Sequence, residues 1–197
     1  MGFTREELEA ARGRSVPDLV PDDPADVRLV FAGINPGLWT AAAQAHFAHP
    51  GNRFFKALHA AGLTARVLDV RDGFDERSRR ALVGRGIVIT NLVDRATARA
   101  DELTRGELRA GAAALAAKVS AWSPAVVAVV GVAAYRVAFG RPRAQVGRQR
   151  ERLAGAELWA LPNPSGLNAH YQLKALAGLY REAAAAAGVE LGRLPDP

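Results

Sequence analysis

The sequence predicts an α/β fold of three layers, in which helices cover both faces of a short central parallel sheet. Three observations predict it. Short apolar runs typical of buried strands recur along the chain, helical patterns separate them, and turns rich in glycine and proline follow two of the runs. Because ligands bind at the carboxyl ends of parallel strands, we expect any active site at that edge of the sheet.

The predicted elements alternate along the chain. Strand patterns occupy residues 27–33, 86–90, 125–131 and 157–161. Helical patterns occupy residues 5–12, a segment from 52 through 61, residues 104–122, a short segment after 131, and residues 171–187. Thr104 and Glu107 have the spacing of a capping box, which marks the start of the third of these helices.

Two regions differ in composition. Residues 1–26 combine a short helical pattern with a connector rich in proline and aspartate, and we expect them to form an N-terminal helix and linker extension. Residues 27–197 carry the strand and helix alternation and are long enough for one compact domain with a buried core. We therefore expect one active site.

Composition excludes several classes of protein. The chain has no cysteine, so it has neither a disulfide framework nor a thiolate zinc site, and its four histidines offer no pair at zinc-ligand helical spacing. We expect no metal and no cofactor. No apolar run is long enough to span a bilayer and the N-terminus lacks a secretory pattern, so we expect a soluble, cytoplasmic protein without a membrane partner.

Charge favours an anionic partner. The formal net charge is +6, and one stretch gathers arginines with a single acid, Glu151, among them. The arginines of this stretch are Arg136, Arg141, Arg143, Arg148, Arg150 and Arg152. Their clustering suggests a face that meets phosphates, although a solvated surface loop is the favoured interpretation for any single member.

The first loop of interest, residues 33–37, directly follows the first predicted strand and reads Gly-Ile-Asn-Pro-Gly. Its glycines allow the backbone to approach a ligand closely and its proline fixes the turn, so Asn35 is held rigidly at the mouth of the sheet. An ordinary turn explains the same letters, and the loop alone does not establish a catalytic role.

The second loop of interest, residues 161–170, lies between the last strand and the last helix. It is dense in turn residues and carries one leucine, Leu167. A leucine on a rigid loop can enter a base stack and fill the space left by an extruded nucleotide. A leucine that anchors the loop to the core is the alternative interpretation.

Together with residues 47–54 and 91–95, these two loops resemble the mismatch-specific uracil-DNA glycosylase and thymine-DNA glycosylase family. The resemblance covers most of the chain, from residue 27 to the last helix, with four motifs in the family's order. It implies a uracil-DNA glycosylase-like catalytic domain over residues 27–197. It also implies a monofunctional enzyme that flips uracil out of double-stranded DNA, mainly opposite guanine, and hydrolyses its bond to the sugar.

The resemblance also implies roles for individual residues. Asn35 corresponds to the asparagine that positions the hydrolytic water, and an amide is suited to orientation because it cannot remove a proton as a carboxylate can. The implied base-binding residues are Ile34, Phe47 and Asn163. The implied wedge and mismatch contacts are Gly166, Leu167 and Asn168, and the implied phosphate contacts are Ser165 and His170.

Asp94 follows the second predicted strand and has two interpretations. It is a second catalytic candidate, as a base or as the holder of a second water, or it forms an ion pair with Arg95 that fixes the loop. The sequence also departs from relatives: the fastest members of the superfamily carry a carboxylate in the first motif, and well-known bacterial members carry a lysine where this chain has Asn91.

We therefore expect the partner to be double-stranded DNA that contains uracil or thymine mismatched to guanine. We expect a monomer, associated with the nucleoid through DNA. Two other functions stay open at this point. One is a DNA-binding module that senses mismatches without catalysis. The other is a nucleotide-binding α/β protein, which is disfavoured because neither glycine-rich phosphate motif occurs.

Overall fold

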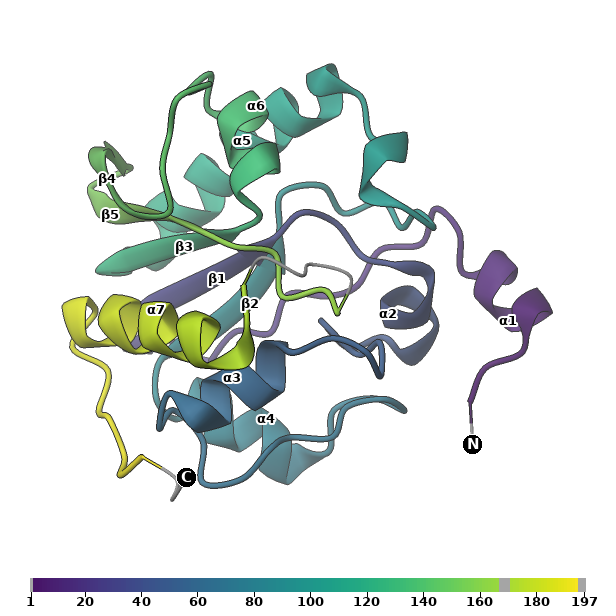
Figure 1. Ribbon diagram of the computed structural model, residues 1–197, viewed down its shortest axis with the longest axis horizontal. Helices are drawn as coiled ribbons and strands as arrows, with labels where there is room; N and C mark the ends of the chain where they lie inside the picture. The colour runs from purple at the N-terminus through teal and green to yellow at the C-terminus, as the bar shows by residue number, and fades with distance from the viewer. Residues whose placement is uncertain (1, 167–170, 195–197) are drawn as a thin grey trace.

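A five-stranded sheet forms the centre of the molecule. The computed structural model describes residues 2–166 and 171–194, and its strands lie in the order β2-β1-β3-β5-β4 (Figure 1). The strands are β1 (Leu29–Gly33), β2 (Ile87–Asn91), β3 (Val126–Val130), β4 (Gly147–Leu153) and β5 (Ala156–Leu161). All neighbouring pairs are parallel except β4 and β5, which are antiparallel.

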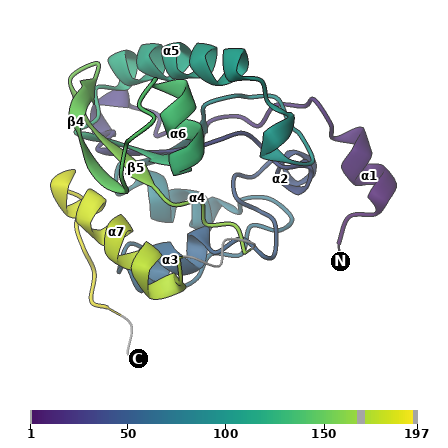
Figure 2. The ribbon, with the colours of Figure 1, turned by 45° about the horizontal axis from the view of Figure 1, so that its top comes forward.

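Helices cover both faces of the sheet, which confirms the predicted α/β fold. One face carries α3 (Phe54–Ala60), α4 (Glu76–Val83) and α7 (Leu173–Ala186), and the other carries α5 (Arg105–Trp122) and α6 (Val132–Ala138) (Figures 1 and 2). Beyond the sheet, α1 (Arg5–Ala10) packs beside α2 (Leu38–Ala43). Two short 3-10 helices, η1 (Pro24–Asp26) and η2 (Ala100–Glu102), complete the elements of the described residues.

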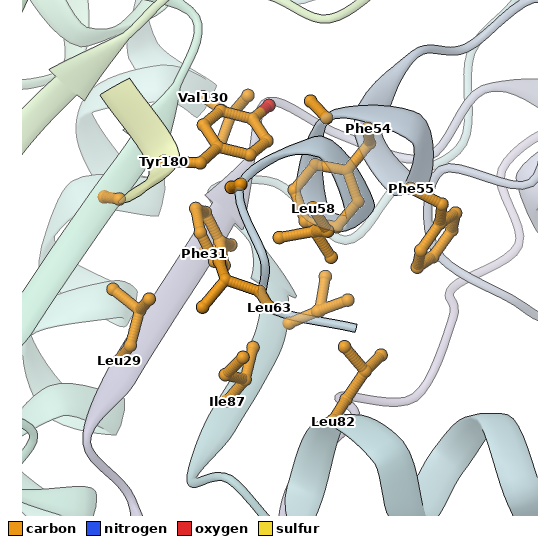
Figure 3. Close-up of a cluster of buried hydrophobic side chains, with 14 of the residues drawn as sticks. Leu29, Phe31, Phe54, Phe55, Leu58, Leu63, Leu82, Ile87, Val130 and Tyr180 are labelled. Atoms are coloured by element: carbon orange, nitrogen blue, oxygen red, sulfur yellow. The ribbon is translucent and has the colours of Figure 1, made fainter. Parts of the chain in front are cut away.

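The strand sequences divide the core into two clusters. Successive side chains of a strand point to opposite faces, so Leu29 and Phe31 of β1 pack under α3 and α7, while Val30 and Ala32 pack under α5 and α6. Figure 3 shows the first cluster, in which Phe31 lies beside Tyr180. Because both faces are covered, these strands are apolar throughout rather than alternating.

One strand and two helices were not predicted. In β4 the exposed side chains are arginines that alternate with partly buried residues, and so polar a sequence lacks the apolar signal of a strand. The arginine stretch therefore contains an edge strand rather than only a loop. α2 and α4 are short, at 6 and 8 residues, and apolar periodicity barely develops over so few positions. The capping box of Thr104 and Glu107 is present at the start of α5.

The N-terminal segment, defined as residues 2–19, packs against the rest of the chain. Ala11, Val16 and Leu19 are buried, and Leu19 pairs with Ile89 through two backbone hydrogen bonds, of 2.9 and 3.0 Å, beside β2. This pairing places the connector along the outer edge of the sheet. Within the described residues, no helix is both long and apolar enough to cross a membrane.

Candidate active site

A cavity of about 840 Å³ lies where the strands of the sheet end. Each of the parallel strands contributes to it at or just beyond its carboxyl end: Ile34 after β1, Asn91 of β2, Val130 of β3 and Asn163 after β5. The remaining lining residues are Leu8, Asn35, Gly37, Leu38, Trp39, Thr40, Phe47, His49, Gly51, Asn52, Ala98, Ala100, Ser165 and Gly166. The cavity brings the two loops singled out in the sequence together at this edge.

The amide of Asn35 is held in one orientation. Its Nδ2 donates to the carbonyl oxygen of Arg95 at 3.0 Å and to Oγ1 of Thr97 at 2.7 Å. A carbonyl can only accept, and the Thr97 hydroxyl uses its own hydrogen on the carbonyl of Arg99 at 2.7 Å, so both neighbours require the donor end of the amide. Oδ1 has no hydrogen-bond partner among the described residues, which leaves an acceptor for a water.

Phe47 lies in the cavity wall on a strained backbone. Its φ of 56° is in the left-handed region, where a bulky side chain costs of order 1–3 kcal/mol. The ring stacks on Phe54 with centroids 4.0 Å apart and planes at 18°. This conformation places a flat apolar ring beside Gly33, where an added Cβ would stand 3.3 Å from Cζ of Phe47. The site therefore offers a surface on which a planar base can stack.

A chain of hydrogen bonds orients the amide of Asn91, which is 6% exposed. His46 Nε2 lies 2.9 Å from the carbonyl oxygen of Pro17, and because that oxygen only accepts, Nε2 carries the proton. Nδ1 of the neutral ring is then an acceptor and takes a hydrogen from Asn91 Nδ2 at 3.2 Å. Oδ1 of Asn91 consequently points towards Gly33, where an added Cβ would lie 2.5 Å from it.

Burial keeps the His46 ring neutral. The side chain is 1% exposed, and removal from water lowers its pKa, while the Pro17 hydrogen bond and the nearby Asp18 oppose this effect. A protonated ring would present two donors and lose its hydrogen bond from Asn91. The observed orientation of Asn91 therefore requires the neutral form of the His46 ring.

The second loop is fixed against the segment before α3. Arg53 donates to the carbonyl oxygens of Ser165 at 2.8 Å and Tyr171 at 2.9 Å, and its backbone N–H donates to Pro164 at 3.0 Å. Gly166 approaches so closely that an added Cβ would lie 2.6 Å from the carbonyl oxygen of Gly51. This close contact explains the glycine at position 166.

Asn163 accepts a hydrogen bond at Oδ1 from the backbone N–H of Ser165, at 2.9 Å. The two residues therefore brace the start of the second loop while they line the cavity. The other residues expected on this loop, Leu167, Asn168 and His170, lie outside the described residues.

Asp94 does not line the cavity. Its side chain is 60% exposed, and its carboxylate lies 3.8 Å from Nζ of Lys118. The alternative ion pair with Arg95 is wrong, because Arg95 pairs with Glu107 at 2.7 Å. Within residues 2–166 and 171–194, no cluster of three or more histidine or acidic side chains is placed to hold a metal ion.

The uracil DNA glycosylase superfamily model matches residues 20–184 of the chain. The chain belongs to this superfamily. A solved structure with the same fold is the solution NMR structure of a candidate uracil DNA glycosylase from Methanosarcina acetivorans, with a TM-score of 0.56 and 16% sequence identity. The likeness covers 87% of this chain and 98% of that one. Membership of the uracil DNA glycosylase superfamily supports the assignment of this chain as a DNA glycosylase, which is a hydrolase that acts on DNA.

Most of the lining residues were not singled out as site residues in the sequence of this superfamily member, and Asn91, Trp39 and Leu8 are among them. Asn91 ends β2 beside β1, and its place at a strand end is a signal that could have indicated it. Trp39 and Leu8 had no such signal, because α2 and α1 reach the cavity only through tertiary packing. Leu8 also lies before the matched residues 20–184.

Proposed function

We propose that this chain is a monofunctional glycosylase that hydrolyses the bond between uracil and the sugar in double-stranded DNA, mainly opposite guanine. Related deaminated or modified pyrimidines are accepted more weakly. The observation that carries the proposal is the fixed amide of Asn35 in the same cavity as Phe47. We expect the protein to act as a monomer in the cytoplasm, associated with the nucleoid through DNA, with residues 27–197 as its catalytic domain.

In the proposed reaction a water attacks the anomeric carbon of an extruded nucleotide. The new bond joins the water oxygen to that carbon, the bond from carbon to base nitrogen breaks, and the base leaves with the electron pair. The proton of the water passes to solvent or to the departing base. Oδ1 of Asn35 is the acceptor that orients the water, and Nδ2 is occupied by its own loop. Orientation is the main contribution of a group that does not titrate.

The base is proposed to lie between Phe47 and the amide of Asn91. Stacking on the Phe47 ring accepts any planar base, so selection needs hydrogen bonds. Oδ1 of Asn91 accepts from the ring N–H of uracil, and the second hydrogen of Nδ2 donates to the adjacent carbonyl. The backbone of Ile34 and the side chain of Asn163 supply further contacts in this proposal. Hydrogen bonds to the carbonyls stabilise the charge that the departing base gathers.

The described residues that line the cavity include no amine, and this supports a hydrolytic enzyme over one that also cleaves the strand. Cleavage through a Schiff base requires an amine at the sugar carbon. The lysines of the chain are Lys56, Lys118 and Lys174, and none of them is among the described residues that line the cavity. The proposed product is therefore an abasic site in an intact strand.

The second loop is proposed to enter the duplex. Gly166, Leu167 and Asn168 fill the gap and contact the mismatch, while Ser165 and His170 contact phosphates. The bracing of this loop by Arg53 supports the proposal, because a wedge must keep its shape while it separates stacked bases. Asp94 stays a weaker catalytic candidate, since its position beside Lys118 does not put it in the cavity.

Replacement of Asn35 tests the proposed mechanism. We expect Asn35→Ala to lose about 100-fold or more in single-turnover excision of uracil opposite guanine, a loss typical of a positioned catalytic group. Affinity for the same duplex is expected to change less than about threefold, because Phe47 and the second loop are untouched. The measurements are alkaline cleavage of the abasic product and a binding titration on one duplex.

Two outcomes would contradict the proposal. Full excision by Asn35→Ala would remove this residue from the mechanism. Mismatch binding without any excision by the unaltered chain would instead indicate a sensor that lacks catalysis.

A further inference from the structure

The N-terminal segment, residues 2–19, contributes to the wall of the cavity. Leu8 of α1 lines the cavity, although α1 has no fully buried residue and lies on the outer side of α2, away from the sheet (Figure 1). The matched superfamily residues begin at 20, so this wall is an addition to the part of the chain that the superfamily describes. Because α1 buries none of its own residues, other contacts of the segment must hold it in place.

The segment is fastened on one side to α2. The ring of Phe3 meets that of Trp39 edge-on, with centroids 5.2 Å apart and planes at 75°, and Trp39 lines the cavity. Ala11 is fully buried against Ala41 of α2. The docking of α1 thus supports a residue that the cavity uses.

The segment is fastened on the other side to the loop that leads to η2. The backbone of Ala96 bonds to Gly13 at 2.9 Å and to Arg14 at 3.0 Å, and Arg12 pairs with Glu102 at 2.7 Å. Ala98 and Ala100, between these two attachment points, line the cavity. The segment therefore joins two lining elements and closes the space between them with Leu8.

The chemistry of this wall suits a base and not a phosphate. Leu8 lines the cavity together with Leu38 of α2 and with Ala98 and Ala100, and all four side chains are apolar. The helix carries Glu6, Glu7 and Glu9 against Arg5, and Arg12 just after it pairs with Glu9 and Glu102. The helix therefore offers no excess of positive charge to a DNA backbone. Apolar containment is the remaining contribution of α1.

The size of the cavity gives that containment a purpose. Cavities of about 300–1,000 Å³ hold drug-sized ligands, and a pyrimidine ring is much smaller than these. A pyrimidine between Phe47 and Asn91 therefore leaves space in a cavity of about 840 Å³ whose wall includes Leu8. That space is available to the apolar substituent of a larger base.

We propose that the N-terminal segment is part of the base-binding site, and that Leu8 sets the largest base the site accepts. This inference rests on the proposed glycosylase function. A small base such as uracil does not reach Leu8. A base with an extended apolar group, such as 5-(1-propynyl)uracil, does reach it and fits only as far as Leu8 permits.

The experiment compares excision of uracil and 5-(1-propynyl)uracil from otherwise identical duplexes. We expect Leu8→Trp to lower the rate ratio of propynyluracil to uracil at least tenfold. We expect Leu8→Ala to raise the same ratio severalfold. Ala10→Trp is the matched control, because Ala10 is exposed on the same helix and does not line the cavity. That variant should leave the ratio unchanged.

The outcomes separate the two proposals. Suppose that all variants excise uracil, and that both Leu8 variants leave the ratio unchanged or move it in the opposite direction. This result would overturn the proposed role of Leu8 and leave the glycosylase function intact. Equal loss of both bases in Leu8→Trp would also overturn it, because the residue would then affect folding and not size. No excision of any base by the unaltered chain would refute the glycosylase function, and the inference with it.

Discussion

His46 connects Pro17 of the N-terminal segment to Asn91 of the cavity. Its protonation state determines which end of the Asn91 amide faces the cavity. With the proton on Nε2 the ring accepts from Asn91, and the Asn91 amide turns its oxygen towards Gly33. Burial lowers the pKa of His46 below its usual value of about 6.5. In the unfolded chain the same ring titrates normally, so folding stability becomes linked to pH through this residue.

The sign of that linkage gives a prediction. Between its ordinary pKa and its lowered folded pKa, His46 binds a proton in the unfolded state and not in the folded state, so stability is complete above about pH 6.5 and falls as pH drops. We expect Tm to fall between pH 7 and pH 5. His46→Asn, whose amide can still accept from Asn91, should show a smaller fall over that range. An equally steep fall in His46→Asn would contradict this origin.

At this scale the sequence predicted a role for the cavity residues Asn35 and Asn163 but none for Asn91. Asn35 stands in a turn whose glycines and proline are visible as letters, and the family resemblance supplied its role. The role of Asn91 depends on His46 and on a carbonyl at Pro17, and these partners are 45 and 74 residues away along the chain. Such an orientation is a property of tertiary structure. The wedge residue Leu167 stays a prediction.

At the scale of elements, the last residue of β1 determines how closely the neighbouring side chains of the cavity can approach this strand. Gly33 is the last residue of β1 and is flanked by Asn91 and by the ring of Phe47. Only the missing Cβ allows both side chains to approach the strand. The strained backbone of Phe47 is maintained by this packing and by its stack on Phe54.

Gly33→Ala tests that packing. The added Cβ would stand 2.5 Å from Oδ1 of Asn91, so we expect the amide to move and excision of uracil to fall at least tenfold. Overpacking of this kind costs about 1–3 kcal/mol in the free energy of unfolding. Gly178→Ala is the control, because nothing lies within 4 Å of an added Cβ there and alanine favours the helix. Unchanged excision in Gly33→Ala would show that Asn91 and Phe47 can move without loss of activity.

The elements themselves were predictable to the extent that their apolar pattern was long. The strands that contribute to the cavity and the long helices α5 and α7 matched their patterns. β4 was missed because its exposed positions are arginines, and α1 was predicted as a helix without any indication of the surface it would meet. Local composition specifies an element, and packing decides what that element contacts.

On the scale of the whole molecule, the formal net charge is +6, and the arginine stretch lies on and beside the edge strand β4. Several arginines of the stretch are paired: Arg141 with Glu151, and Arg148 with Glu157 at 2.7 Å. Arg143 lies in the connection before β4, whose first residue Gly147 pairs with Ala160 near the cavity end of β5. Arg152 lies near the opposite end of β4 and bonds to the carbonyl of Gly155 at 2.8 Å.

These positions predict different contributions to DNA affinity. We expect Arg143→Ala to reduce the slope of log affinity against log salt by about one, as for the loss of one phosphate contact. Arg152→Ala, at the end remote from the cavity, should leave the slope unchanged. The measurement is duplex binding over a range of salt concentrations. Equal slopes for both variants and the unaltered chain would exclude the β4 side from the footprint.

The two flanks of the sheet differ in how they resist association with other chains. A bare outermost strand offers free amide and carbonyl groups to any extended peptide, which is the first step towards aggregation. β2 is shielded at Ile89 by Leu19, whereas β4 relies on the charged side chains of Arg148, Arg150 and Arg152 at its exposed positions. Neutral replacements there would leave an edge strand open to pairing with another chain. Resistance to aggregation at high concentration therefore depends on the arginines of this edge strand.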